Sequence, residues 1–207
     1  MYQPKIQITN AAEVRAILGA PLGNQARKVI DHIDGHCRSW IARTPFIVIS
    51  SINGAGAMDV SPKGDLPGFV KVVDPRTLAI PDRPGNHRAD TLLNVIENPS
   101  VGIIFMVPRR REVVRVNGTA LIVRDPDLLD ELAVNEKAPE FAIVVRVREA
   151  FFHCGKSVIR SGLWEPERWG PVDGLPTYAQ AIKDHANSID AVETIQARID
   201  RNDELLY

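Results

Sequence analysis

MDVSPKGDLPGFVKVVDPRTLAIPDRPGNHRADTLLNVIEN, residues 58–98, is the stretch of this chain that decides its fold. Residues 59–65 predict the end of a strand that runs into a tight turn at Pro62. Residues 78–81 predict a second strand, which ends at Pro81 because proline cannot donate a backbone hydrogen bond. The stretch therefore places two strand ends and several fixed charges close together.

The loop 82–88 opens a helix over residues 89–97, whose apolar face we expect to consist of Leu92, Leu93 and Ile96. Such a loop favours anions, because the first helical turn has unpaired N–H groups and the helix dipole attracts negative charge. Arg83 and Arg88 add planar guanidinium donors, and Asn86 adds an amide donor. An ordinary solvated turn is the alternative interpretation.

Alternation of apolar and polar residues predicts most of the remaining strands. We expect strands over 46–52, 57–61, 69–73, 77–81, 101–107, 112–123 and 142–152. Short turns between them favour antiparallel neighbours. The fold class is therefore mainly β with peripheral helices (α+β), with six or more mostly antiparallel strands closing a small barrel.

Helices are expected at both ends of the chain. Asn10 and Glu13 form a capping pair for a short helix, and a longer helix is expected over 25–42. Further helices are expected over 125–135, 155–161, 176–185 and 191–206. Residues 1–207 are predicted to form a single domain, in which helices 1–43 and a helical tail 154–207 flank a barrel core, 44–153.

Several long motifs resemble one known family. They are SPKGD-PGFV near 61–70, IPDRPGN-R-D near 80–90, NP-VG-IF near 98–105, E-VRVNG-A near 112–120 and HCGKSVIRSGLW at 153–164. These motifs are similar to those of FMN-binding split-barrel proteins related to pyridoxamine 5′-phosphate oxidase, within a bacterial subfamily. The resemblance runs from Phe46 to about Val123 and resumes at His153. It implies a split β-barrel and a homodimer that binds FMN at the subunit interface.

The resemblance also implies which residues hold the flavin. The isoalloxazine would lie along the backbone of Asp59, Val60, Ser61, Pro62 and Lys63, with the Lys63 side chain near its edge. The phosphate would lie at the loop that contains Pro81, Asp82, Arg83, Asn86 and Arg88. Taken alone, Lys63 could equally be a solvated lysine.

Four more residues are assigned to the flavin site with an alternative role for each. Arg115 lies in the middle of a strand, where a cross-strand carboxylate or the flavin would serve as its partner. Lys156, Arg160 and Trp164 match the late motif of the family, which would come from the second subunit. A surface turn in which Trp164 is a core anchor is the other interpretation.

The expected function is an FMN-dependent oxidoreductase that acts on a small organic substrate. No catalytic acid, base or nucleophile stands out, which suits an enzyme whose cofactor carries the hydride chemistry. The alternatives are a non-catalytic flavin-binding protein and a split barrel that binds F420 or haem. The pattern that pyridoxamine phosphate oxidases use for the substrate phosphate is absent from the tail, so we expect a different substrate.

Composition and charge exclude several classes of protein. The net charge of −1 gives no general attraction to nucleic acid, and the basic run 108–111 has no aromatic residues within it. No apolar run is long enough to span a bilayer, and no signal peptide is recognisable. We therefore expect a cytoplasmic protein in which Cys37 and Cys154 are free thiols.

A metal site is not expected. His32 and His36 lie four residues apart, with Asp31 and Cys37 beside them, which is a spacing that metals can use. The glutamate of the zinc-protease motif is missing, so we expect solvated or capping histidines instead.

Overall fold

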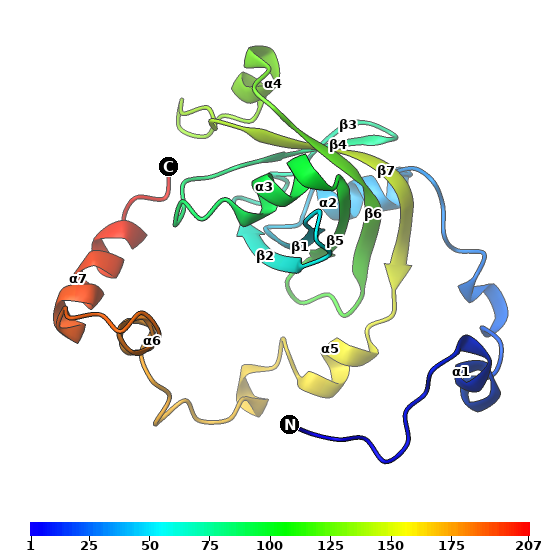
Figure 1. Cartoon of the computed structure of the whole chain (residues 1–207). Helices are drawn as coiled ribbons and strands as arrows, with labels where there is room; N and C mark the ends of the chain where they lie inside the picture. The colour runs from blue at the N-terminus through cyan, green and yellow to red at the C-terminus, as the bar shows by residue number, and fades with distance from the viewer.

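The computed structural model describes residues 1–207 and contains one seven-stranded antiparallel sheet (Figure 1). The strands are β1 (Phe46–Ile52), β2 (Met58–Gly64), β3 (Lys71–Asp74), β4 (Thr77–Pro81), β5 (Ser100–Met106), β6 (Val113–Val123) and β7 (Ala142–His153). Their order across the sheet is β2-β1-β5-β6-β7-β4-β3. The prediction of a mainly β protein with a split barrel and peripheral helices is confirmed.

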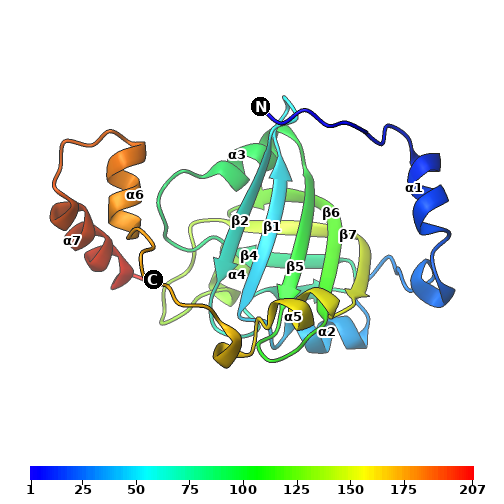
Figure 2. The same cartoon turned by 90° about the horizontal axis from the view of Figure 1, so that it is seen from below.

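The sheet curls into a barrel that is split between its two edge strands, β2 and β3 (Figure 2). A β-bulge between Asn117 and Gly118 helps the long β6–β7 pair to bend. Only glycine fits at position 118, because a Cβ atom there would lie 2.2 Å from the carbonyl oxygen of Arg146. The bend brings the open edge of β2 toward the end of β4.

The core lies inside the barrel and follows from the alternation along each strand. Ile47 and Ile49 of β1, Phe105 of β5, and Val114 and Val116 of β6 point inward and are buried. Burying an aliphatic or aromatic side chain of this size contributes about 1.5–3 kcal/mol. Alternate residues on the outer face stay partly exposed, which is the pattern of a sheet with one covered face.

Helices cover the ends of the barrel or lie beside it. Those near the barrel are α2 (Gly35–Ile41), α3 (Asp90–Glu97), α4 (Pro126–Glu131) and α5 (Lys156–Ser161). Helix α1 (Ala11–Leu18) and the pair α6 (Tyr178–His185) and α7 (Val192–Asp203) lie on opposite sides of the barrel (Figures 1 and 2). As predicted, Asn10 caps α1 by accepting a hydrogen bond from the Glu13 amide.

The long helix predicted over 25–42 is wrong. A 3₁₀ turn occupies Gly23–Gln25, and the chain then continues as a turn and irregular backbone until α2 begins at Gly35. Ile30 pairs with Ala150 of β7 through two backbone hydrogen bonds, which a helix would not allow. Asp34 then starts α2 by accepting a hydrogen bond from the Cys37 amide.

Three smaller expectations also need correction. The apolar face of α3 is turned differently, because Thr91 and Val95 are buried whereas Leu93 and Ile96 are exposed. The predicted helix over 125–135 is shorter and ends at Glu131. Strand β2 does not end before Pro62 but continues through it to Gly64, since an edge strand tolerates a missing N–H.

Candidate functional site

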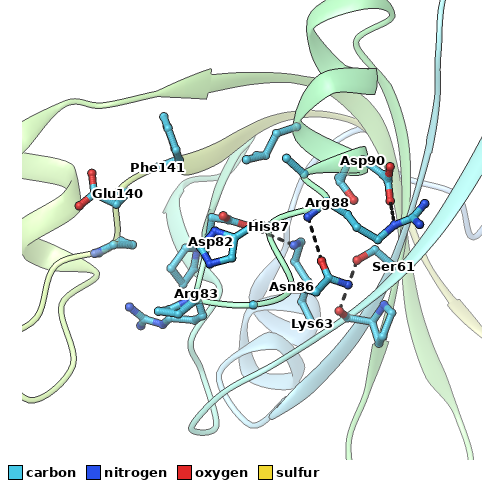
Figure 3. Close-up of a pocket in the computed structure, with 18 of the residues that line it drawn as sticks. Ser61, Lys63, Asp82, Arg83, Asn86, His87, Arg88, Asp90, Glu140 and Phe141 are labelled. Atoms are coloured by element: carbon cyan, nitrogen blue, oxygen red, sulfur yellow. Dashed lines mark hydrogen bonds and ion pairs between the residues drawn. The ribbon is translucent and has the colours of Figure 1, made fainter. Parts of the chain in front are cut away.

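A cavity with a volume of about 1050 Å³ lies at the split of the barrel (Figure 3). One wall consists of β2, the loop 82–89 and the start of α3. The opposite wall consists of residues 137–141 and Tyr207. Ten of the fourteen site residues that the sequence predicts line this cavity: Asp59, Val60, Ser61, Pro62, Lys63, Pro81, Asp82, Arg83, Asn86 and Arg88.

Strand β2 supplies one side of the cavity because it is an edge strand that pairs only with β1. Asp59 and Lys63 are half-buried there. The Lys63 ammonium lies 3.3 Å from an Asp82 carboxylate oxygen, so the ion pair joins β2 to the residue after β4. The Thr91 hydroxyl donates to Asp59 over 3.4 Å and ties the same strand to α3.

The loop 82–89 holds its polar groups through local hydrogen bonds. Asn86 accepts a hydrogen bond from the Arg88 amide over 3.0 Å, and the Arg88 guanidinium donates to Asp90 over 2.7 Å (Figure 3). The carboxylate of Asp90 raises the pKa of Arg88 through that hydrogen bond. The Arg88 side chain is 72% exposed and uses only its Nε in this pair, so its terminal nitrogens can reach a ligand.

Two residues of this loop have a left-handed backbone that side chains disfavour. His87 has φ of 60° and Ala89, which precedes α3, has φ of 56°. Each such residue costs stability unless its surroundings hold it in place. Concentrated backbone strain of this kind is typical of ligand-binding loops.

Arg83 is already engaged, which the sequence did not reveal. Its Nε donates to Asp65 over 2.5 Å, and a terminal nitrogen donates to the Leu132 carbonyl over 2.9 Å. The Asp65 side chain is 1% exposed and the Arg83 side chain 14% exposed, so the pair is buried. Arg83 therefore helps to position the loop, while its side chain still lines the cavity.

The Asp65 carboxylate has three donors around it. Burial alone would raise the pKa of Asp65, but the Tyr207 hydroxyl, the Leu66 amide and the Arg83 guanidinium outweigh burial, so its pKa lies below the ordinary value. The Tyr207 hydroxyl donates over 2.6 Å, and this hydrogen bond raises the pKa of Tyr207. The carboxylate therefore stays ionised at neutral pH and links the two walls of the cavity.

The wall formed by residues 137–141 and Tyr207 was missed by sequence reasoning. Phe141 and Glu140 face the loop 82–89 across the cavity (Figure 3). The Lys137 ammonium donates to the Tyr207 carbonyl over 2.8 Å, which holds the tail against this wall. No local pattern predicts this wall, because it brings together residues far apart in the chain.

Four predicted site residues lie outside the cavity: Arg115, Lys156, Arg160 and Trp164. Arg115 is on the outer face of β6, with its guanidinium 5.0 Å from the centre of the Phe151 ring. Trp164 follows α5 and donates its indole N–H to the Arg110 carbonyl over 2.8 Å. Within one chain these residues do not meet the residues of the cavity.

Neither cysteine lines this cavity. No group of three or more His, Cys, Asp or Glu side chains is arranged to hold a metal ion, and His32 contacts Asp31 instead. Burial raises the pKa of Cys37 to about 12, and Cys154 is exposed. None of the helices is both long enough and apolar enough to cross a membrane.

Comparison with known proteins identifies the family. The family model described as "Pyridoxamine 5'-phosphate oxidase" matches residues 33–154, and no curated protein matches the chain. Among solved structures, HupZ of Group A Streptococcus is 17% identical, with 58% of this chain and 93% of that chain covered and a TM-score of 0.48.

Two further solved structures are more distant. An FMN-binding protein of Syntrophomonas wolfei is 12% identical, with 56% of this chain and 82% of that chain covered and a TM-score of 0.44. HutZ, a heme storage protein of Vibrio cholerae, is also 12% identical, with 59% of this chain and 94% of that chain covered and a TM-score of 0.41. Identities this low do not transfer a ligand from one protein to another.

Proposed function

Because the chain belongs to the pyridoxamine 5′-phosphate oxidase family, we propose that the cavity at the split of its barrel binds FMN. The protein then acts as an FMN-dependent oxidoreductase on a small organic substrate. The supporting observation is that ten residues, chosen from sequence motifs alone, line one cavity. Its volume of about 1050 Å³ is enough for a cofactor and part of a substrate.

The phosphate would bind where the loop 82–89 meets α3. Arg88 offers free terminal nitrogens there, and the first turn of α3 offers N–H groups that have no partner within the helix. Asn86 organises the loop through its hydrogen bond to the Arg88 amide. Asp90 competes for Arg88, so we expect phosphate binding to draw the guanidinium away from that carboxylate.

The ring would bind along the open edge of β2. Pro62 lacks an N–H and lies in the strand without breaking it, so we expect its backbone to face away from β1. By alternation, the N–H groups of Val60 and Gly64 then also face away from β1 and can donate to a ring edge. Lys63 and Asp82 are paired beside this edge and place one positive and one negative group there.

These residues suit FMN in chemical type: cations and helical N–H groups for a phosphate, and a strand edge with a lysine for the polar rim of a ring. When bound, FMN supplies the hydride or electron transfer. The protein's part is to orient the ring and to exclude water with Phe141 and Tyr207.

We further propose that the working unit is a homodimer whose second copy completes the site. Arg115, Lys156, Arg160 and Trp164 lie outside the cavity of their own chain, and in the proposed dimer the second copy would bring them to it. Exposed apolar side chains near the cavity support a covered surface, among them Val60, Leu93 and Ile96. These side chains are 63%, 55% and 72% exposed in one chain.

The test of FMN binding is to titrate the flavin-free protein with FMN and to measure binding by the change in flavin fluorescence. We expect saturation at one FMN per chain, reduction of the bound flavin by NADH or NADPH without oxygen, and reoxidation by air. A flavin that binds but is not reduced by either nucleotide would favour a flavin-binding protein without catalysis. A protein that takes up no FMN would refute the proposal.

The test of the shared site is co-expression of two inactive chains, Arg88→Ala and Trp164→Ala. If each site combines Arg88 of one chain with Trp164 of the other, a mixed dimer has one site with both substitutions and one site with neither. The mixed dimer should therefore bind FMN at one of its two sites. Each variant expressed alone should bind FMN weakly. A monomeric wild-type protein with full FMN, measured by sedimentation, would contradict the dimer.

A split barrel that binds haem or F420 is the second candidate. Haem needs an axial ligand, and His87 is the one histidine that lines the cavity. A Soret band lost in His87→Ala would therefore favour haem. Mass analysis of the ligand released by heat separates FMN from F420.

A further inference from the structure

A second compartment adjoins the flavin cavity and has a volume of about 680 Å³. It lies between residues 64–67, the loop 83–87 and the segment 202–207. Arg83, His87 and Tyr207 line both spaces, so they form the partition between them. A space of this size suits a small organic ligand, since such pockets usually measure roughly 300–1,000 Å³.

The partition is held by buried polar contacts. The Tyr207 ring lies 5.6 Å from the Arg83 guanidinium, and its hydroxyl donates to the buried Asp65. The Lys137 ammonium, in the same wall, donates a hydrogen bond to the backbone carbonyl of this tyrosine. The segment 202–207 is therefore fixed at its last residue, directly between the two spaces.

The chemistry of the second compartment differs from that of the flavin cavity. Leu66, Leu205 and Leu206 line it and are 62%, 65% and 66% exposed, so an apolar ligand would cover them. The charge of Arg83 is balanced by Asp65, whereas Asp203 has no ion-pair partner. The compartment thus carries a net negative charge, which disfavours an anion.

We propose that this second compartment binds the non-reacting end of the substrate, an apolar group without negative charge, while the reacting end shares the first cavity with the flavin. Tyr207 is the positioning residue between the two ends. The role of the ligand as a substrate rests on the proposed FMN function, but binding of a ligand to the compartment can be measured without the flavin. A substrate phosphorylated at its non-reacting end is excluded, because the compartment has no free cation to hold the phosphate.

Three probes of nearly equal shape test the charge preference: benzamidine is cationic, benzamide neutral and benzoate anionic. Calorimetric titration is done on the protein with and without FMN. We expect benzamidine and benzamide to bind and benzoate to bind roughly tenfold more weakly, because like charges brought together in an interface are unfavourable. Asp203→Asn should reduce the difference in affinity between benzamidine and benzoate. Benzoate that binds as well as benzamide would overturn the proposal.

Filling the compartment tests the location. Leu66→Trp places a large side chain in it, and Leu66 does not line the flavin cavity. We expect the heat of benzamide binding to disappear while FMN binding stays within threefold of wild type. Leu206→Trp is a second filling variant, and Leu175→Trp, an exposed leucine outside both spaces, is the control.

The outcomes separate the two proposals. A wild type that binds benzamide but not FMN would refute the flavin function and leave the compartment standing. A wild type that binds FMN, with benzamide binding unaffected by both filling variants, would overturn this inference alone. Tyr207→Ala should weaken benzamide binding, and an unchanged affinity would remove Tyr207 from its assigned role.

Discussion

The wall formed by β2, the loop 82–89 and α3 comes from one continuous stretch of chain, whereas the opposite wall joins residues 137–141 to Tyr207. The continuous wall carries the strained backbone and the exposed arginine. The discontinuous wall carries the tail and its anchoring contacts. The comparison teaches that the wall proposed to bind the cofactor is encoded locally, while the enclosure of the cavity depends on tertiary contacts.

Asp65 joins the two walls, and its loss should have the largest effect. In Asp65→Ala the Arg83 guanidinium remains buried without its counter-charge, which should lower the free energy of unfolding by about 3–5 kcal/mol. Urea unfolding followed by circular dichroism measures the change. Asp90→Ala is the matched control, because its partner Arg88 is exposed and little should change. Equal stability of the two variants would show that the walls are not joined at Asp65.

The second effect concerns the continuous wall. Arg88→Ala should weaken FMN binding about tenfold or more, because a charge-assisted hydrogen bond to the phosphate is lost. Arg198→Ala is the control: this arginine is similarly exposed, and it pairs with Asp190 in the tail. FMN titrations of both variants give the comparison. If both variants bind FMN with equal affinity, the phosphate does not bind at the loop 82–89.

The third effect is a dependence of stability on pH. The folded state lowers the pKa of Asp65, so its contribution is present above the unfolded pKa and is lost as pH falls through the folded pKa. We expect the free energy of unfolding to fall between about pH 5 and pH 2. Asp65→Asn should lack that part of the decrease. Parallel pH profiles for wild type and variant would contradict the assignment.

The smallest expected effect is a gain. Ala89 has a left-handed backbone, which glycine adopts without strain, so Ala89→Gly should raise the free energy of unfolding by about 1 kcal/mol. Ala181→Gly, inside helix α6, should instead lower it by about 1 kcal/mol. Thermal unfolding measures both. A lower free energy of unfolding in Ala89→Gly than in the wild type would mean that the backbone of the loop is not strained.

The sequence predicted the barrel because alternation in β1, β5, β6 and β7 reports directly which residues face the core. It failed where distant contacts override a local pattern. The apolar periodicity of residues 25–42 suggests a helix, but Ile30 pairs with Ala150 instead. The apolar face of α3 was also misassigned: Leu93 and Ile96 are exposed in the single chain, although they are apolar.

The same limit applies to the candidate site. Residues of the continuous wall were identified from motifs, and they do line one cavity. The contacts of Arg83 with Asp65 and the Leu132 carbonyl could not be predicted, because these partners lie far from it in the chain. Tyr207 was missed because nothing in its local sequence indicates that it reaches Asp65, far away in the chain.

The central claim is that this cavity holds one FMN per chain. The most direct test is the absorbance spectrum of the purified protein after incubation with FMN and removal of the excess, followed by mass analysis of the ligand that heat releases. The account predicts flavin bands and close to one FMN per chain. A colourless protein, or a released ligand other than FMN, would contradict it.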